Sequence, residues 1–568
     1  MGTHKPLSMP IFYIVCFISL VLTCFAFILS LNSPAQGYEV SIYTSTPSKI
    51  WVIIGVNIVI SIVLLVNEAR IKSQSKRWLW ALGILILNNS IVLLMSVLRG
   101  YFAVGSDTLM HIGYVRDLAN GIISPLNIYP LLHLIPAFFV KLGMTPSLAT
   151  NLSPLYWYLI YISSFYCLAK IAFKENIILV VTLSALLFIP HSAGLAGTNV
   201  AVSVFPLTIV ATMIVCRNFN LINIIIFILF IVYVLFLHPL ALEVAFIALF
   251  LSLFIVGSYR KNVFILIGSL VIVVTVWQVF TRGDIISEVV NDLWASLGRI
   301  KFPSLNGVQL AQTNGEYSSI MLLLRKYGGE LLLGSLAFVS LIVMAVKYRS
   351  LTRYKLYFII IFVAVNLMWI AGWLLHLPRY NFALIRIMYW AVPTSIIVVS
   401  LILKHLPKNI LTMLLLIIII LPMALFGIFN RYLSEFVGAE NTQVTQQQIQ
   451  GIKFLVEIGN PETYIVHLNG QRTSRYVASL YGAEWTRKNR GYYWVQKMEG
   501  WNNFNYNKYK TLGDAYDEDI YLVVTKQDKT LPRWENDKLY KINNDPTATL
   551  LYKDGEEFEA WFVNGDGK

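Results

Sequence analysis

The sequence predicts a polytopic α-helical membrane protein of about 13 transmembrane helices, followed by a C-terminal extracytoplasmic α/β domain. Of its 568 residues, 57% are hydrophobic and only 13% are charged. About a quarter of a soluble protein is typically charged. Many apolar runs reach or approach the roughly 20 residues that cross a bilayer as a helix. These runs are continuous rather than alternating, which excludes a closed β-barrel.

The apolar runs define the expected spans in chain order. The first run is too long for the core of a signal peptide and has no clear cleavage site, so we interpret it as a retained helix. All four cysteines lie in apolar runs, and no disulfide framework is expected. The spans are 11–31, 50–66, 78–98, 150–169, 176–190, 200–216, 221–237, 240–257, 262–280, 331–346, 356–375, 387–403 and 409–428.

Basic residues set the predicted orientation. Lys and Arg gather in alternate connections, so the positive-inside rule places the N-terminus in the cytoplasm. This pattern holds only if 130–143 lies along the outer membrane surface, since one more span there would invert every later basic connection. The predicted division is a membrane module, 1–428, with large outer loops at 99–149 and 281–330, and an extracytoplasmic domain at 429–568.

The C-terminal region has the composition of a separate soluble domain. It carries 17 Lys plus Arg and 19 Asp plus Glu, so the net charge of +14 belongs to the membrane module. That excess suits connections facing anionic lipid and gives no support to nucleic-acid binding. Its patterns predict a structural or acceptor-recognition domain with helices at 446–458 and 475–481 and strands at 463–468, 520–525 and 558–563.

The first outer loop holds a cluster of ionisable residues beside a span. Asp107 is the candidate general base, because partial desolvation at the membrane edge would raise its pKa. The alternative is that Ser106 or Asp107 is a helix N-cap. His111 follows one helical turn later, where it either orients Asp107, binds phosphate or is an ordinary surface histidine.

A family resemblance rests on this layout and on short motifs. The residues are Asp107, His111, Asn120-Gly121 and Tyr129-Pro130-Leu131-Leu132-His133. With a long first outer loop, many spans and an outer C-terminal domain, the chain resembles the GT-C superfamily of membrane glycosyltransferases. That group includes protein O-mannosyltransferases, aminoarabinose transferases and the catalytic subunit of oligosaccharyltransferase. The helix and strand order of the tail resembles archaeal members, and the Ile-rich composition also suggests an archaeon.

A second match is Leu377-Pro378-Arg379-Tyr380, just before a late span. GT-C members that use lipid-phosphate sugars often carry such an Arg-Tyr, so the resemblance implies substrate binding by Arg379 and Tyr380. Arg386 lies seven residues later, on the same face of a helix. Both guanidinium groups suit a phosphate. The alternative for both is snorkelling to lipid headgroups.

The departures from the family bear on metal binding. Oligosaccharyltransferases pair their first acidic motif with a second acidic site in the next outer loop, but here 191–199 has no carboxylate, and the tail has no Trp-Trp-Asp element. A divalent-metal site of several carboxylates therefore has poor support, and no cofactor is firmly predicted. Thr108 stands where protein O-mannosyltransferases have the second acid of an Asp-Glu pair, so Asp107 is expected to act alone.

The remaining candidate substrate-binding residues lie at the outer ends of helices. Tyr129 and His133 belong to the second surface helix. His238 and Glu243 lie where two spans meet, and the choice between lining a cavity and forming a buried structural pair stays open. The 281–330 loop is long enough for a lid or substrate clamp.

The predicted function is inverting glycosyl transfer from a polyprenyl- or dolichyl-phosphate-linked sugar. The acceptor would be a glycan, a lipid-linked oligosaccharide or a protein on the outer face of the cell membrane. One alternative is en bloc transfer like that of an oligosaccharyltransferase. A lipid or sugar transporter is another, although no internal repeat is evident. A structural scaffold is disfavoured by the ionisable cluster.

Overall fold

A computed structural model describes most of the chain. The described residues are 8–71, 75–124, 127, 129–173, 177–186, 194–195, 197–253, 263–272, 275–276, 319–347, 353–374, 381–403, 409–468, 472–489, 509–516, 518–530 and 541–565.

Helices dominate the first three quarters of the chain. Six are long and apolar enough to cross a membrane: 9–31, 48–69, 146–172, 199–217, 324–346 and 411–429. The helices of the module are α1 (Met9–Leu31), α2 (Ile42–Ser45), α3 (Ser48–Ile71), α4 (Trp78–Leu93), α5 (Met95–Leu98), α6 (Ser106–Ala119), α7 (Pro130–Lys141), α8 (Pro146–Asn151), α9 (Ser153–Ala172), α10 (Ile177–Leu186), α11 (Gly197–Arg217), α12 (Leu221–Leu237), α13 (Pro239–Ser252), α15 (Ser319–Lys347), α16 (Arg353–Leu374), α17 (Asn381–Leu403) and α18 (Ile410–Phe429). The prediction of a polytopic helical membrane protein is confirmed.

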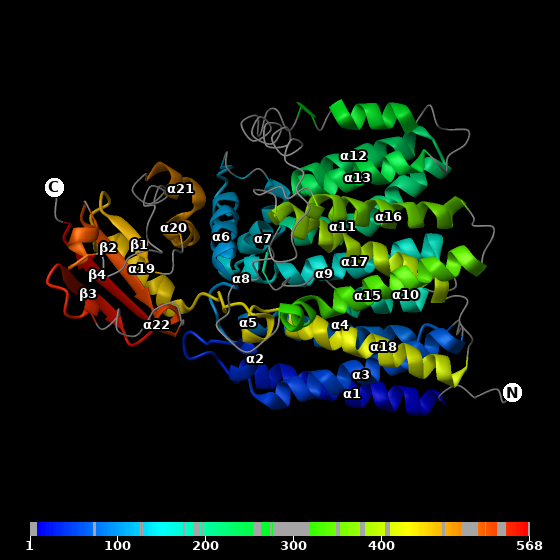
Figure 1. Cartoon of the computed structure of the whole chain (residues 1–568), viewed down its shortest axis with the longest axis horizontal. Helices are drawn as coiled ribbons and strands as arrows, with labels where there is room; N and C mark the ends of the chain where they lie inside the picture. Colours follow the sequence, from blue (N-terminus) through cyan, green and yellow to red (C-terminus); the bar gives the residue numbers. More distant parts are fainter. Residues whose placement is uncertain are drawn as a thin grey trace.

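The long helices lie side by side in one bundle, and α6, α7 and α8 lie across one of its ends (Figure 1). The C-terminal domain sits beyond this end, and α1 begins at the opposite end. A short apolar helix spans only about 1.5 Å per residue. At 12 residues, α7 is therefore too short to span and instead covers the end of the bundle, where it packs against α6, α8 and α12.

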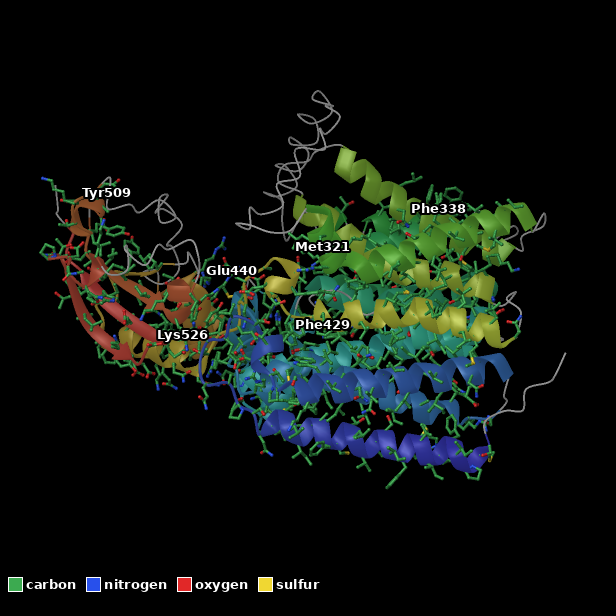
Figure 2. All side chains as sticks on the ribbon, turned by 60° about the horizontal axis from the view of Figure 1, so that its bottom comes forward. Met321, Phe338, Phe429, Glu440, Tyr509 and Lys526 are labelled. Atoms are coloured by element: carbon green, nitrogen blue, oxygen red, sulfur yellow. The ribbon has the colours of Figure 1, made fainter. Side chains whose placement is uncertain are left out.

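Apolar side chains coat the outside of the bundle as well as its core. Phe338 on α15 is 61% exposed and projects from the bundle (Figure 2). Inside, one polar cluster is paired across helices: Asn57 on α3 accepts from Ser19 on α1 and donates to Thr23 and Asn88. Soluble proteins usually show the reverse, with apolar side chains inside and polar side chains outside. Apolar side chains on the outside suit contact with lipid, where buried amides must find partners within the protein.

The C-terminal domain contains a four-stranded sheet in the order β1-β2-β4-β3. Strands β1 and β2 are parallel, and β4 is antiparallel to β2 and β3. A capping box between Thr445 and Gln448 starts the first helix. The elements are η2 (Glu435–Val437), α19 (Gln446–Ile458), β1 (Tyr464–His467), α20 (Thr473–Tyr481), α21 (Ala483–Lys488), η5 (Gly513–Ala515), β2 (Ile520–Thr525), α22 (Lys526–Thr530), β3 (Ala548–Asp554) and β4 (Phe558–Val563).

One face of this sheet shares its core with the first outer loop. Leu109 and Ile112 of α6 are fully buried in the same cluster as Val523, Tyr476 and Ile452 of the domain. Backbone pairing joins the same regions, since Val444 donates to the Ala103 carbonyl and accepts from Phe102. The first outer loop and the C-terminal domain therefore fold as one packed unit.

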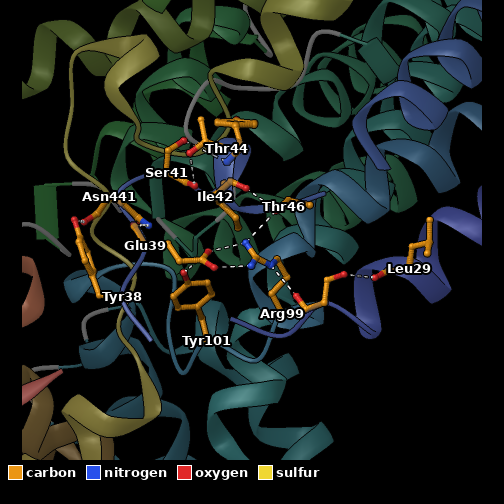
Figure 3. Close-up of polar contacts among 12 residues, drawn as sticks. Leu29, Tyr38, Glu39, Ser41, Ile42, Thr44, Thr46, Arg99, Tyr101 and Asn441 are labelled. Carbon is orange, nitrogen blue, oxygen red and sulfur yellow. Dashed lines mark hydrogen bonds and ion pairs between the residues drawn. The ribbon is translucent and has the colours of Figure 1, made fainter. Parts of the chain in front are cut away.

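A buried ion pair ties the N-terminal helices to this unit (Figure 3). The Arg99 guanidinium contacts both oxygens of Glu39 at 2.5 and 2.6 Å, and Tyr101 donates to the same carboxylate. Arg99 also donates to Thr46 and to the Ser33 carbonyl. Asn441 donates to the Glu39 carbonyl, so the connection into the domain is held here too.

Candidate functional site

The candidate base Asp107 lies in the first turn of α6, at the junction of bundle and domain. Its carboxylate is 78% exposed and contacts Arg475 of α20, with 2.7 Å between Oδ1 and Nη2. The expected partial desolvation of Asp107 is therefore wrong. A fixed cation from the C-terminal domain, 23% exposed, neutralises the acid instead.

His111, one turn along α6, belongs to a chain of three side chains. Its Nδ1 lies 2.8 Å from Nε2 of His133 on α7. Nδ1 of His133 lies 2.9 Å from Oδ1 of Asn127. The two imidazole rings are tilted by 33°, with centroids 5.0 Å apart, and Tyr114 packs on His133. His111, predicted to be catalytic, and His133, predicted to bind substrate, are therefore in direct contact.

Burial keeps both imidazoles neutral. It lowers the pKa of His111 from 6.5 to about 4, although the Asp107 carboxylate acts in the opposite direction. The pKa of His133 falls well below its ordinary value, first because of burial and second because of His111. Two imidazolium ions at hydrogen-bond distance would repel each other strongly in a dry environment. The two rings therefore favour the neutral form together.

Tyr129 and His238 extend the cluster along α7. The Tyr129 ring lies 5.0 Å from the ring of His238, which ends α12. A Cβ at Gly197 of α11 would collide with the His238 ring, so glycine allows this close packing. Five predicted residues are thus contiguous: Asp107, His111, His133, Tyr129 and His238.

Residues just before α11 reach the same place. Gly194 lies close to α6, where an added Cβ would be 3.2 Å from the Thr108 hydroxyl. Leu195 next to it is buried. The residues that precede α11 therefore border the N-terminal turn of α6.

The C-terminal domain is fixed to α6 by close packing and by polar contacts. A Cβ at Gly113 would lie 2.7 Å from the carbonyl oxygen of Ala478, so α6 and α20 touch backbone to backbone. Arg116 donates to the Ser479 carbonyl. Asp117 accepts from the Glu484 backbone at the start of α21, where Gly482 offers no side chain. Arg116 and Asp117 therefore join α6 to the C-terminal domain.

The late-span candidates are only partly described. Arg379 and Tyr380 lie outside the described residues, as do residues 281–318 of the predicted lid, 281–330. Arg386 and Glu243 belong to α17 and α13, but the placement of their side chains lies outside the description as well. Their predicted roles stay predictions.

Metal ligation has no support within the described residues, among which no three His, Cys, Asp or Glu side chains are grouped for it. All four cysteines are free.

Two residues of the site were not predicted from the sequence. Arg475 lies 368 positions after Asp107 and belongs to another domain, so no local pattern connects them. Asn127 falls in the short, mostly apolar connection between α6 and α7, six residues before His133. Its proximity to Tyr129-Pro130 was a signal available to sequence reasoning, because a polar residue just before a surface helix is well placed to contact the first turns of that helix.

Comparison with known proteins adds no relative: neither a protein-family model nor any curated protein sequence matches this chain significantly.

Proposed function

We propose that this protein is an inverting membrane glycosyltransferase of the GT-C type, with about thirteen spans, a cytoplasmic N-terminus and an extracytoplasmic C-terminal domain. It transfers a sugar from a polyprenyl- or dolichyl-phosphate donor to a glycan, lipid-linked or protein acceptor. The placement of the start of α1 and of the C-terminal domain at opposite ends of the bundle supports this orientation (Figure 1).

The observation that carries the proposal is the polar cluster at one end of an apolar bundle. Asp107, His111, His133 and Arg475 meet where α6, α7 and α20 converge. Ionisable residues at the membrane edge are costly unless they have a function or a partner. A carboxylate, neutral imidazoles and an arginine are also the groups that proton abstraction and phosphate departure require.

The reaction divides into two charge movements. The acceptor hydroxyl loses its proton to a base of the site while its oxygen bonds to the anomeric carbon of the sugar. The bond between that carbon and the phosphate oxygen breaks, and the electron pair leaves with the polyprenyl phosphate. In-line attack inverts the anomeric configuration. Arg379 and Arg386 are proposed to stabilise the departing phosphate, on the strength of the family resemblance.

Two rivals make different predictions. En bloc transfer by an oligosaccharyltransferase-like enzyme would use a metal ion, which the loop 191–199 without carboxylates does not favour. A transporter would move the lipid-linked sugar without breaking the glycosidic bond.

A donor screen with purified protein in detergent separates these functions. The substrates are polyprenyl-phosphate-linked hexoses, pentoses and an oligosaccharyl diphosphate, each offered with and without chelator. The expected result is release of polyprenyl phosphate from one monosaccharide donor, with chelator having no effect. Intact donors together with flipping in proteoliposomes would favour the transporter, and chelator-sensitive use of the oligosaccharide donor would favour en bloc transfer.

A further inference from the structure

We infer that His111 Nε2 accepts the proton in the proposed transfer, and that His133 and Asn127 are positioning residues that fix its tautomer. The inference rests on the proposed function and deepens it, because it moves the base from Asp107 to a histidine.

The direction of the hydrogen bonds starts from Asn127. Its Oδ1 is an acceptor, so Nδ1 of His133 carries the hydrogen at that contact. A neutral imidazole has one hydrogen, which leaves Nε2 of His133 as an acceptor. Nδ1 of His111, 2.8 Å away, must then donate. Nε2 of His111 is left with its lone pair.

The backbone of Tyr129, one helical turn before His133, also forms a hydrogen bond that raises the pKa of His133 against the larger effect of burial. A contact that raises the pKa is one to which the ring donates, in keeping with donation by His133 to Asn127.

The lone pair of His111 is available to a substrate. The side chain is partly exposed, while His133 is buried behind it. Within the described part of the chain, the only hydrogen bond of His111 is the one through Nδ1. An imidazole whose Nδ1 is held by a neighbour and whose Nε2 carries the lone pair is the usual arrangement of a histidine base.

Asp107 is less suited to take the proton. Its Oδ1 already contacts Nη2 of Arg475 at 2.7 Å. Its 78% exposure also surrounds it with water. Asp107 and Arg475 instead place one negative and one positive group beside His111, where they bias its protonation in opposite directions.

The proton balance follows from the tautomers. The acceptor O–H gives its proton to Nε2 of His111 as the new glycosidic bond forms, and the polyprenyl phosphate leaves with the electron pair of the broken bond. His111 is then an imidazolium, with Nδ1 still donating to His133 and Asp107 nearby to balance the charge. Release of the proton to water through the exposed edge restores the neutral pair.

The charged and titratable groups facing His111 are Asp107 on its own helix, Arg475 on α20 and His133 on α7. His111 must be neutral to act as a base. Transfer should therefore persist through neutral pH and fall as the pH decreases toward about 4. Raising the pH above neutrality should not increase the rate through this group.

The direct test is the tautomer of His111 in the ligand-free protein. With 15N-histidine labelling, solid-state NMR at pH 7 reports which ring nitrogens carry hydrogen, and His111→Gln identifies the signal among the 8 histidines. The expected result is Nδ1 protonated and Nε2 bare, with loss of that state in Asn127→Leu and its retention in Asn127→Asp, whose carboxylate is a stronger acceptor. A hydrogen on Nε2 would overturn the inference, whether or not the protein transfers sugar.

The kinetic test uses the donor found in the screen. Replacing the base with His111→Gln should lower kcat by about 100- to 10,000-fold with little change in donor KM. Asn127→Leu should lower kcat less and Asn127→Asp should restore it. If Asp107→Asn abolishes transfer while His111→Gln does not, the proposed function stands and this inference fails. If no wild-type donor is found, the proposed function fails while the NMR result still decides the tautomer.

Discussion

Two ion pairs near the junction of bundle and C-terminal domain differ in burial and in their surroundings. Glu39 and Arg99 are 14% and 3% exposed, meet through two contacts and have further partners in Tyr101 and Thr46. Asp107 contacts Arg475 at 2.7 Å, with the acid 78% exposed. The first pair joins the connection after α1 to the residue that follows α5, and the second joins α6 to α20.

This difference in burial indicates that the Glu39–Arg99 pair is a structural contact, whereas the Asp107–Arg475 pair can open and close in water. A buried charge that loses its partner costs several kcal/mol, whereas an exposed pair contributes little because water competes for both ions. The buried pair therefore fixes the geometry of the junction. The exposed pair is free to reorganise around a ligand, and this distinction can be tested by breaking each one.

The largest effect is expected from Arg99→Ala. It leaves the Glu39 carboxylate buried without its cation, so the free energy of unfolding should fall by about 3–5 kcal/mol. Denaturant unfolding in detergent measures it. The matched control is Lys453→Ala, which breaks an exposed pair with Glu457 on α19 and should cost about 0.5 kcal/mol or less. Equal effects of the two changes would contradict the contrast between buried and exposed pairs.

Gly113→Val tests whether the contact of Asp107 with Arg475 depends on the close packing of α6 against α20. The added side chain meets the Ala478 carbonyl and must push α20 away from α6, at a cost of about 1–3 kcal/mol. Thermal unfolding and the accessibility of a cysteine placed at Arg475 measure the shift. Gly83→Ala on α4 is the control, because its Cβ meets nothing within 4 Å. If the control lowers the melting temperature as much as Gly113→Val, the packing argument fails.

His467→Phe measures how much a buried imidazole lowers the free energy of unfolding. His467 is 2% exposed, stacks on Tyr476, and has no hydrogen bond at either ring nitrogen. Phenylalanine keeps the stacking and removes the unpaired nitrogens, so the protein should gain about 1–3 kcal/mol.

This gain should grow as the pH falls. Burial lowers the pKa of His467 from 6.5 to about 3, so the unfolded chain binds a proton in this range that the folded protein does not. Wild type therefore loses stability from this position as the pH falls from 6.5 toward 3, and phenylalanine does not. Asp528, whose pKa burial raises to about 7, contributes the opposite slope in both proteins and cancels in the difference. A variant less stable than wild type at pH 5 would contradict this reasoning.

The smallest change in stability is expected from Arg475→Gln. Breaking the exposed pair should cost about 1 kcal/mol or less. The pH dependence of transfer should nevertheless change, because the Arg475 charge lowers the pKa of His111. Without this cation, the pKa of His111 should rise, and the loss of activity at acidic pH should begin at a higher pH. A pH profile identical to that of wild type, at equal stability, would show that Arg475 has no effect on the site.

The sequence predicts the helical framework well because apolar run length is a strong and local signal. The run 221–237 coincides with α12 (Leu221–Leu237), and the ranges 520–525 and 558–563 coincide with β2 and β4. Strand β3 (Ala548–Asp554) was not predicted. It is an edge strand with mostly exposed or partly exposed residues, so it carries little hydrophobic pattern.

The site was predictable only where its residues are close in the sequence. Asp107 and His111 share one helical turn, and a motif points to His133. The contact of Asp107 with Arg475 depends on the docking of a whole domain. The burial that makes His111 and His133 neutral also arises from tertiary packing, so residue types alone favoured the acid as base.

The most direct test of the account is the rate at which purified His111→Gln releases polyprenyl phosphate, relative to wild type, at pH 7 and with the same melting temperature. We expect a rate at least about 100-fold lower. In the same variant, the hydrogen of His133 should remain on Nδ1. Equal rates for the variant and wild type would contradict the assignment of this junction as the catalytic site.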